Sequence, residues 1–248
     1  MGIDDLQIRI AVVELMGYRE WTEELGSDRE WMIQGIQAKL YGAAQQRASK
    51  LGGFVIPIRY DYMIVLASNL NKRAHKQILD TIKRHSPVKP RMASACSETP
   101  LAAEEAASNL LSKAGEGELY FDECEGREVA VVGHIDVDDI TGLTRALGAY
   151  KSYMKVVEIL AYLQGYISKW GGMTQYLGGD NVLAILPPPN FHDIVEKLRD
   201  VKGLKIKTGV GVAPTFRAAL MLAAEALHDI RVNNSRFRVA VRVGNPLV

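Results

Sequence analysis

The chain has 248 residues, of which 48% are hydrophobic and 24% charged, and its formal net charge is +1. This composition excludes a disordered or collagen-like chain, and the near-neutral charge argues against a dedicated nucleic-acid binder. No apolar run approaches the roughly 18 residues of a membrane span, and the first residues lack the pattern of a secretory signal. The two cysteines, Cys96 and Cys124, are too few for a disulfide framework or a zinc cage. We expect a cytoplasmic protein without a membrane or nucleic-acid partner.

An internal repeat organises the sequence. Residues 52–61 and 171–180 both begin with Gly-Gly and end with Asp, and 171 − 52 and 180 − 61 both give an offset of 119. In chain order, the first half predicts a strand over 8–15, a helix over 31–51, a tight turn at 59–62 between two short strands, a helix over 71–85, a strand over 88–95 and an alanine-rich helix over 101–114. The second half repeats this order at 129–136, 144–170, 178–181, 191–200, 204–212 and 216–230, and a basic strand over 236–243 follows.

Strand-helix-strand-strand-helix-strand is the ferredoxin-like order. The sequence therefore predicts an α+β fold of two tandem ferredoxin-like (βαββαβ) domains, each an antiparallel sheet with helices on one face. We place the N-terminal domain at 1–114, a linker at 115–127 and the C-terminal domain at 128–248. Two similar halves favour pseudo-twofold packing with a cleft between them.

Two carboxylates of the second half are expected to meet. Asp136 ends the opening strand and Asp180 lies in the hairpin, and these strands are neighbours in a ferredoxin-like sheet. Such a pair suits Mg²⁺, which takes one or two protein carboxylates plus water and phosphate oxygens. Gly178 and Gly179 allow positive φ and the close approach of an anion, and the loop 138–142 offers amides of a helix start to a phosphate. Gly-Gly-Asp-Asn alone is equally typical of a plain turn, but Asp136 on the adjacent strand favours a functional site.

The first half departs from this pattern. It keeps Asp61 but replaces the two glycines with Arg59 and Tyr60, and the offset of 119 brings Asp136 onto Gly17. We therefore expect a degenerate metal site in this half. Arg59 would face the cleft and contact a phosphate or a base edge, with a solvated strand-end residue as the alternative.

At 134–142 the sequence reads His-Ile-Asp-Val-Asp-Asp-Ile-Thr-Gly, and Gly-Gly-Asp-Asn follows at 178–181. Together with 17–22 and Arg-Tyr-Asp at 59–61, these motifs resemble archaeal GTP cyclohydrolase III from about residue 8 to residue 230. More distantly they resemble the palm domains of GGDEF diguanylate cyclases and class III nucleotidyl cyclases, where two aspartates hold two Mg²⁺. The first half departs from the family at Met16 and Gly17, where an acidic residue is expected, and at Tyr62, which replaces an asparagine.

The resemblance implies Mg²⁺-dependent hydrolysis of GTP that opens the imidazole ring and releases two phosphates. The product would be 2-amino-5-formylamino-6-ribosylaminopyrimidin-4(3H)-one 5′-phosphate, a precursor for archaeal flavins and deazaflavins. The resemblance further implies two Mg²⁺ ions held by Asp136, Asp180 and the Val137 carbonyl, and it suggests a monovalent cation such as K⁺ and a homo-oligomer, dimer or tetramer. Asp136, Asp180 and His134 are the predicted catalytic residues, although His134 is equally consistent with a structural histidine. The predicted substrate-binding residues are Asp138, Asp139, Ile140, Thr141, Gly178, Gly179, Asn181, Arg59 and Asp61.

Two other functions stay open. A nucleotidyl cyclase would use the same metal pair to join the 3′-oxygen to the α-phosphate, and a non-catalytic nucleotide sensor would suit a degenerate first half. A cyclase needs two competent protomers or a transition-state Arg/Asn helix, neither of which is legible in the sequence, and the presence of both Asp136 and Asp180 disfavours a sensor. Gly209-Val-Gly211 is not a dinucleotide fingerprint, because Pro214 occupies the third glycine position.

Overall fold

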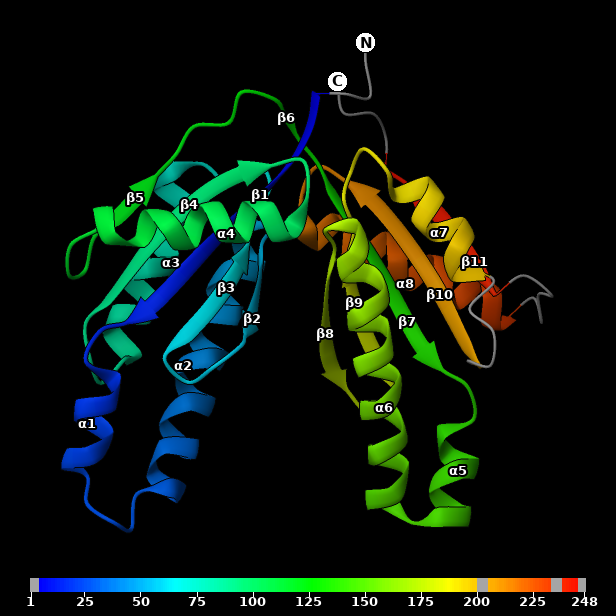
Figure 1. Ribbon diagram of the computed structural model, residues 1–248, viewed down its shortest axis with the longest axis horizontal. Coiled ribbons are helices and arrows are strands. Elements are labelled where there is room, and N and C mark those ends of the chain that lie inside the picture. The colour runs from blue at the N-terminus through cyan, green and yellow to red at the C-terminus, as the bar shows by residue number, and fades with distance from the viewer. Residues whose placement is uncertain (1–4, 200–204, 233–237, 245–248) are drawn as a thin grey trace. The chain divides into compact units, whose positions relative to one another are not determined.

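A computed structural model describes residues 5–199, 205–232 and 238–244 (Figure 1). The chain divides into two compact units, and each is described here by itself. The first unit comprises residues 8–97 and 102–128, and the second comprises residues 1–7, 98–101 and 129–248. Among the described residues, no helix is both long and apolar enough to cross a lipid bilayer.

The first unit is built on one sheet with the strand order β2-β3-β1-β4-β5, and β6 also pairs with β1. Along the path from β2 to β5 the pairing is antiparallel except between β4 and β5. Its elements are β1 (Leu6–Leu15), α1 (Tyr18–Glu24), α2 (Glu30–Leu51), β2 (Phe54–Pro57), β3 (Tyr62–Leu66), α3 (Lys72–His85), β4 (Pro90–Ser97), α4 (Pro100–Leu110), the 3₁₀ turn η2 (Leu111–Lys113), β5 (Leu119–Phe121) and β6 (Arg127–Glu128).

The second unit repeats this plan with the strand order β11-β10-β7-β9-β8, antiparallel except between β10 and β11. Its elements are β7 (Ala130–Val137), α5 (Ile140–Leu147), α6 (Ala149–Ile167), the 3₁₀ turn η3 (Ser168–Trp170), β8 (Met173–Gly178), β9 (Asn181–Ile185), α7 (Phe191–Arg199), β10 (Ile206–Ala213), α8 (Phe216–Val232) and β11 (Val239–Val243). The predicted tandem ferredoxin-like fold is therefore confirmed, and each half adds a fifth strand parallel to its neighbour.

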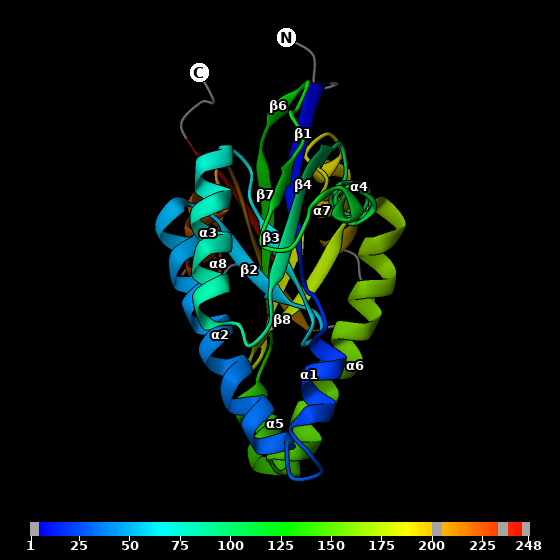
Figure 2. The ribbon, with the colours of Figure 1, turned by 90° about the vertical axis from the view of Figure 1, so that its left-hand side faces the viewer.

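Alternation along the central strand explains how the helices are placed. Ala11 and Val13 of β1 pack in one cluster with α2 and α3, whereas Val12 packs in a second cluster with Ala107 of α4. The two helices of the βαββαβ order thus share one face of the sheet, as expected, and the alanine-rich helix covers the other. Figure 2 shows α2 and α3 on one side of this sheet and α4 on the opposite side.

The structure differs from the predicted elements in two places. Residues 115–127, expected to be a linker, contain β5, which pairs with β4 and belongs to the first unit. The long helix expected over 144–170 is broken at Gly148, which has φ 87° and separates α5 from α6. The first half also has two helices before its hairpin, because α1, which was not predicted, precedes α2 and is separated from it by residues 25–29.

Gly209 and Gly211 on β10 have a packing role. A Cβ on Gly209 would collide with the backbone oxygen of Ala223, and one on Gly211 would collide with that of Ala219. Both oxygens belong to α8, which therefore lies directly on the strand. This close approach explains a Gly-Val-Gly pattern that resembles a nucleotide fingerprint without being one.

Replacing Gly211 with alanine should destabilise the protein by about 3 kcal/mol, because a backbone clash cannot be relieved by a rotamer change. Urea unfolding followed by far-UV circular dichroism measures the effect. Gly165→Ala is the matched control: it lies within α6 with no atom near the added methyl, so it should stabilise by up to about 1 kcal/mol. Equal effects of the two variants would contradict the packing argument.

Candidate active site

The two predicted metal carboxylates lie at one end of two paired strands. Asp136 of β7 is directly opposite Asn181 of β9, and the carbonyl of Asp180 accepts a hydrogen bond of 3.0 Å from the amide of Val137. The strand adjacency inferred from the sequence is therefore confirmed. Asp136 is buried, with 6% of its surface exposed, and this burial raises its pKa, with a smaller contribution from the nearby charge of Asp180.

The hairpin before Asp180 needs its glycines for conformation. Gly178 has φ 108° and Gly179 has φ 61°, both in the left-handed region that glycine adopts without strain. A Cβ on Gly178 would meet no atom within 4 Å, so protein crowding does not explain the glycine. The hydroxyl of Tyr176 donates to the carbonyl of Gly179 at 3.2 Å and holds the turn.

His134, Asn181 and Asp180 form a hydrogen-bonded row. His134 Nε2 lies 2.8 Å from Asn181 Oδ1, and Asn181 Nδ2 donates to Asp180 Oδ1 at 2.8 Å. Because Asn181 Oδ1 can only accept, this pattern assigns the proton of His134 to Nε2. His134 thus contacts the site through Asn181 and orients the amide beside Asp180.

Three cations that the sequence analysis did not select surround these carboxylates. Arg231, in the last turn of α8, donates to Asp136 Oδ1. Arg238 donates to Asp138 Oδ2, and Lys207 Nζ lies 3.1 Å from Asp138 Oδ1. The sequence hinted at Arg238 only through its basic final strand and at Lys207 only through its alternation with Lys205, and no pattern pointed to Arg231.

The surroundings shift the pKa values of Asp136, which lies in β7, and Asp138, which directly follows β7, in opposite directions. Burial raises the pKa of Asp136 above its ordinary value, and Arg231 offsets this only in part. Burial also acts to raise the pKa of Asp138, but hydrogen bonds from Arg238 and Lys207 outweigh it, so that the pKa of Asp138 is lowered. Two carboxyl groups two residues apart therefore have different proton affinities.

The loop after β7 places Asp139 at the start of α5. Asp139 has φ 56°, and its Oδ1 accepts a hydrogen bond of 3.2 Å from the amide of Gly142. The amide of Gly142, one of those expected to face a phosphate, therefore already donates its hydrogen bond to a carboxylate of the protein. Ile140 is half-buried and Thr141 is exposed in the first turn of α5.

The donor set fits a magnesium ion that shares its ligands with a substrate. In the part of the chain that the structure describes, the one cluster of three metal-ligating acidic, histidine or cysteine side chains is Cys96, Cys124 and Glu128, which includes no residue of this site. Asp136 and Asp180 are thus two carboxylates rather than a complete cage. Mg²⁺ commonly binds through one or two carboxylates and completes its shell with water and phosphate oxygens.

The expectation that the first half has no carboxylate equivalent to Asp136 is wrong. Glu14 of β1 lies opposite Tyr62 of β3, as Asp136 lies opposite Asn181. The amide of the next residue, Leu15, donates to the carbonyl of Asp61 at 2.8 Å, as Val137 donates to Asp180. The opening strands are offset by 122 residues and the hairpins by 119. Comparing the two halves at the single offset of 119 therefore did not align Glu14 with Asp136.

The carboxylates of the first half are each paired with an arginine. Glu14 Oε2 accepts from Arg91 Nε at 2.6 Å. Arg59 donates to both oxygens of Asp61, at 2.9 and 2.7 Å. The two first-half residues expected to contact substrate, Arg59 and Asp61, are therefore brought together, and they contact each other.

A duplicated ferredoxin-like fold with two convergent aspartates beside a Gly-Gly hairpin defines a candidate metal and phosphate site. The family model of GTP cyclohydrolase III matches residues 10–243 of the chain. The GTP cyclohydrolase III of Aeropyrum pernix is 49% identical over 90% of this chain and 92% of its own length. That of Saccharolobus solfataricus is 31% identical over 92% of this chain and 97% of its own length. The chain belongs to the GTP cyclohydrolase III family.

A solved structure gives a weaker likeness. The GGDEF domain of DgcB from Caulobacter crescentus, in complex with c-di-GMP, superposes with a TM-score of 0.40 at 15% identity over 46% of this chain and 77% of that one. A likeness this weak carries no argument about the present protein.

Asp136→Asn and Asp138→Asn should change stability with opposite dependence on pH. The raised pKa of Asp136 means that its ionised form costs folded-state stability, so Asp136→Asn should gain on the wild type as pH rises above the ordinary value of 3.8. The lowered pKa of Asp138 means that its charge stabilises, so Asp138→Asn should be less stable at neutral pH and converge with the wild type as pH falls below 3.8. Melting temperatures of chelator-treated protein between pH 3 and pH 8 (roughly the window set by these shifts) test both, and slopes of the same sign would contradict the assignment.

Proposed function

We propose that this protein hydrolyses GTP in a magnesium-dependent reaction, opens the imidazole ring and releases two phosphates. The product would be 2-amino-5-formylamino-6-ribosylaminopyrimidin-4(3H)-one 5′-phosphate. The observation that carries the proposal is the convergence of Asp136 and Asp180 at the end of paired strands, in a chain of the GTP cyclohydrolase III family. The GTP cyclohydrolases III of Aeropyrum pernix and Saccharolobus solfataricus match this chain over nearly their whole length.

The proposed ligands of the magnesium ions are Asp136, Asp180 and the Val137 carbonyl. Two bound Mg²⁺ would neutralise a triphosphate and polarise its phosphoryl groups. Asp136 and Asp180 are suited to hold them because both lie at the same strand ends and their negative charges are close. Arg231 must leave Asp136 for a cation to bind there, and its side chain, 48% exposed, is long enough to move.

The remaining residues would position the nucleotide. Gly178 and Gly179 leave the hairpin backbone open to a phosphate, since neither would place a Cβ against the protein. Asn181 is oriented by His134, and we assign His134 a positioning role through this amide. Arg59 and Asp61 are proposed nucleotide contacts, although a substrate phosphate would have to compete with Asp61 for the Arg59 guanidinium.

A homo-oligomer, dimer or tetramer, is part of the proposal, as is stimulation by a monovalent cation such as K⁺. Exposed apolar side chains on α6 support the oligomer: Tyr150 is 73% exposed, Met154 47% and Tyr153 46%. Large apolar residues gathered on one exposed helix are typical of interaction surfaces. Light scattering on the purified protein distinguishes a dimer or tetramer from a monomer.

Asp136→Asn and Asp180→Asn should each lower the rate of GTP turnover by at least about a thousandfold, because each removes one of two carboxylates that hold the metal. Loss of the purine absorbance, release of inorganic phosphate and mass spectrometry of the product together measure the reaction. Glu116→Gln is the control, since Glu116 is exposed in the first unit beside Lys89, belongs neither to the proposed metal ligands nor to α6, and should keep full activity.

The same assay separates the rival functions. A nucleotidyl cyclase would release pyrophosphate and a cyclic nucleotide, and a sensor would bind GTP without changing it. Undiminished turnover in either aspartate variant, with the fold intact by circular dichroism, would remove the metal assignment.

A further inference from the structure

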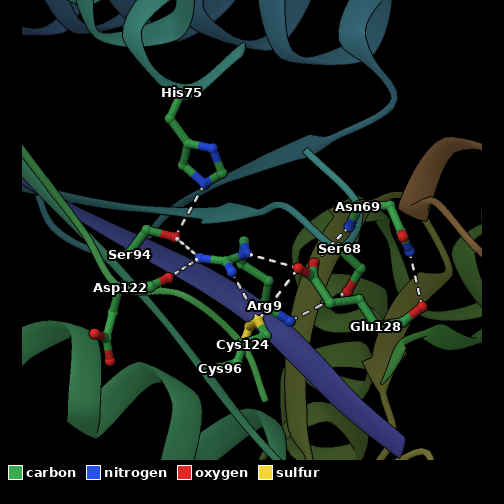
Figure 3. Close-up of a disulfide and its surroundings, with 9 residues drawn as sticks. All are labelled: Arg9, Ser68, Asn69, His75, Ser94, Cys96, Asp122, Cys124 and Glu128. Atoms are coloured by element: carbon green, nitrogen blue, oxygen red, sulfur yellow. Dashed lines mark hydrogen bonds and ion pairs between the residues drawn. A yellow bond between two sulfur atoms is a disulfide. The ribbon is translucent and has the colours of Figure 1, made fainter. Parts of the chain in front are cut away.

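A disulfide that was not predicted from the sequence connects two parts of the first unit. Cys96 lies in β4 and Cys124 follows β5, 28 residues later, with 5.6 Å between their Cα atoms. Two cysteines are too few for a framework of disulfides, but this spacing of Cα atoms suits a single one. Figure 3 shows the pair at the centre of a network of polar side chains.

Arg9 of β1 organises this network. It is 1% exposed, and its Nε donates to Glu128 Oε1 at 3.1 Å. Its Nη1 donates to the carbonyl of Asp122 at 2.8 Å, and its Nη2 lies 2.7 Å from Cys124 Sγ. The ring of Phe121 lies 4.2 Å below the guanidinium. One buried cation therefore contacts both ends and the middle of the segment 122–128 (Figure 3).

The charge of Arg9 is balanced by Glu128. His75 Nε2 bonds Ser94 Oγ, which in turn accepts from Arg9 Nη1, but burial lowers the pKa of His75 to about 4, so this histidine is neutral. Glu128 is held from its other side by the amide of Asn69, which donates to Oε2 at 2.6 Å.

Cys124 has partners that serve a thiol as well as a disulfide. Its Sγ lies 3.2 Å from Glu128 Oε1 and 2.7 Å from Arg9 Nη2. In the disulfide, the sulfur can only accept from Arg9. In the reduced form, its S–H can also donate to Glu128. Cys124 further lines a cavity of about 550 Å³ beside Lys72 and Arg127, which gives a small thiol room to reach it.

From these contacts we propose that Cys96 and Cys124 form a reversible redox site, whose disulfide fixes the segment 122–128 to β4 and whose reduction by a dithiol releases it. This proposal is independent of the function proposed above. A thiolate of the dithiol attacks Cys124 Sγ from the cavity, the S–S bond breaks, and Cys96 leaves as a thiolate that takes up a proton. The second thiol of the reductant then attacks the mixed disulfide, frees Cys124 and leaves as a cyclic disulfide, so that two electrons pass to the protein.

A metal site is the competing use of these side chains. The ligand atoms of Cys96, Cys124 and Glu128 lie within 4.8 Å of one another. However, the Arg9 guanidinium contacts both Cys124 Sγ and Glu128 Oε1, so a positive charge already occupies the position next to two of the three ligands. The arrangement therefore favours thiol–disulfide exchange over cation binding.

The test equilibrates the whole protein, with a chelator, in mixtures of oxidised and reduced dithiothreitol. Free thiols are then trapped by alkylation and counted by mass spectrometry. We expect a single two-electron transition between no free thiol and two, in the folded protein. Reduction should speed amide hydrogen exchange in 122–128 at least tenfold and lower the melting temperature by roughly 10 °C, as expected for opening a loop of this length.

The double variant Cys96→Ser/Cys124→Ser is the control and should show no response to reductant in either measurement. In single variants, a disulfide reagent should label Cys124 in Cys96→Ser faster than Cys96 in Cys124→Ser, because Cys124 lines the cavity. The proposal is overturned if the thiols stay alkylatable under oxidant, if the disulfide is reduced only on unfolding, or if both states exchange hydrogen equally. Stoichiometric zinc binding that protects both thiols would replace it with a metal site.

Discussion

The candidate active site depends on the pairing of β7 with β9. Ile135 of β7 lies opposite Val182 of β9, and both side chains are fully buried. This contact fixes the register by which Asp136 lies opposite Asn181. A slip of one residue would turn Asp136 to the other face of the sheet. The hydrogen bond from Val137 to the carbonyl of Asp180 then ties the hairpin to the strand end. The hydrophobic core thereby sets the spacing of the two carboxylates.

Charge balance is the second constraint on this site. Asp136 of β7 and Asp138 just after it each have a cationic partner, and these partners lie in β10, in α8 and directly before β11. An unpaired buried carboxylate would be costly. A divalent cation that binds Asp136, as we propose, would have to displace Arg231, and the freed guanidinium would then be available to a phosphate. In the function proposed above, metal and nucleotide binding would be coupled through this exchange of partners.

The fold and the adjacency of Asp136 and Asp180 could be predicted from the sequence, because both depend on local patterns that recur in the two halves. The two halves do not keep one offset, however: it falls from 122 at Glu14 and Asp136 to 119 at Asp61 and Asp180. Loops of different length cause this drift, so comparison at a fixed offset hid Glu14. Arg231 was not predicted because a helix end meets a strand end only after packing. The pairing of Cys96 with Cys124 likewise depends on the parallel contact of β4 with β5, which no spacing in the sequence encodes.

The two halves show how one backbone gives two electrostatic outcomes. In the first unit Arg91, the neighbour of Glu14 on β4, pairs with Glu14 directly. Burial and a hydrogen bond to Glu14 raise the pKa of Tyr62 to about 12, so Tyr62 remains neutral beside Glu14. In the second unit the corresponding neighbour of Asp136 is Lys207, yet Lys207 pairs with Asp138. Asp136 pairs instead with Arg231, an exposed side chain at the end of α8. A carboxylate held by its strand neighbour and a tyrosine would resist a metal ion, whereas one held by a long, exposed side chain can exchange its partner, which supports our proposal that the second unit binds the metal.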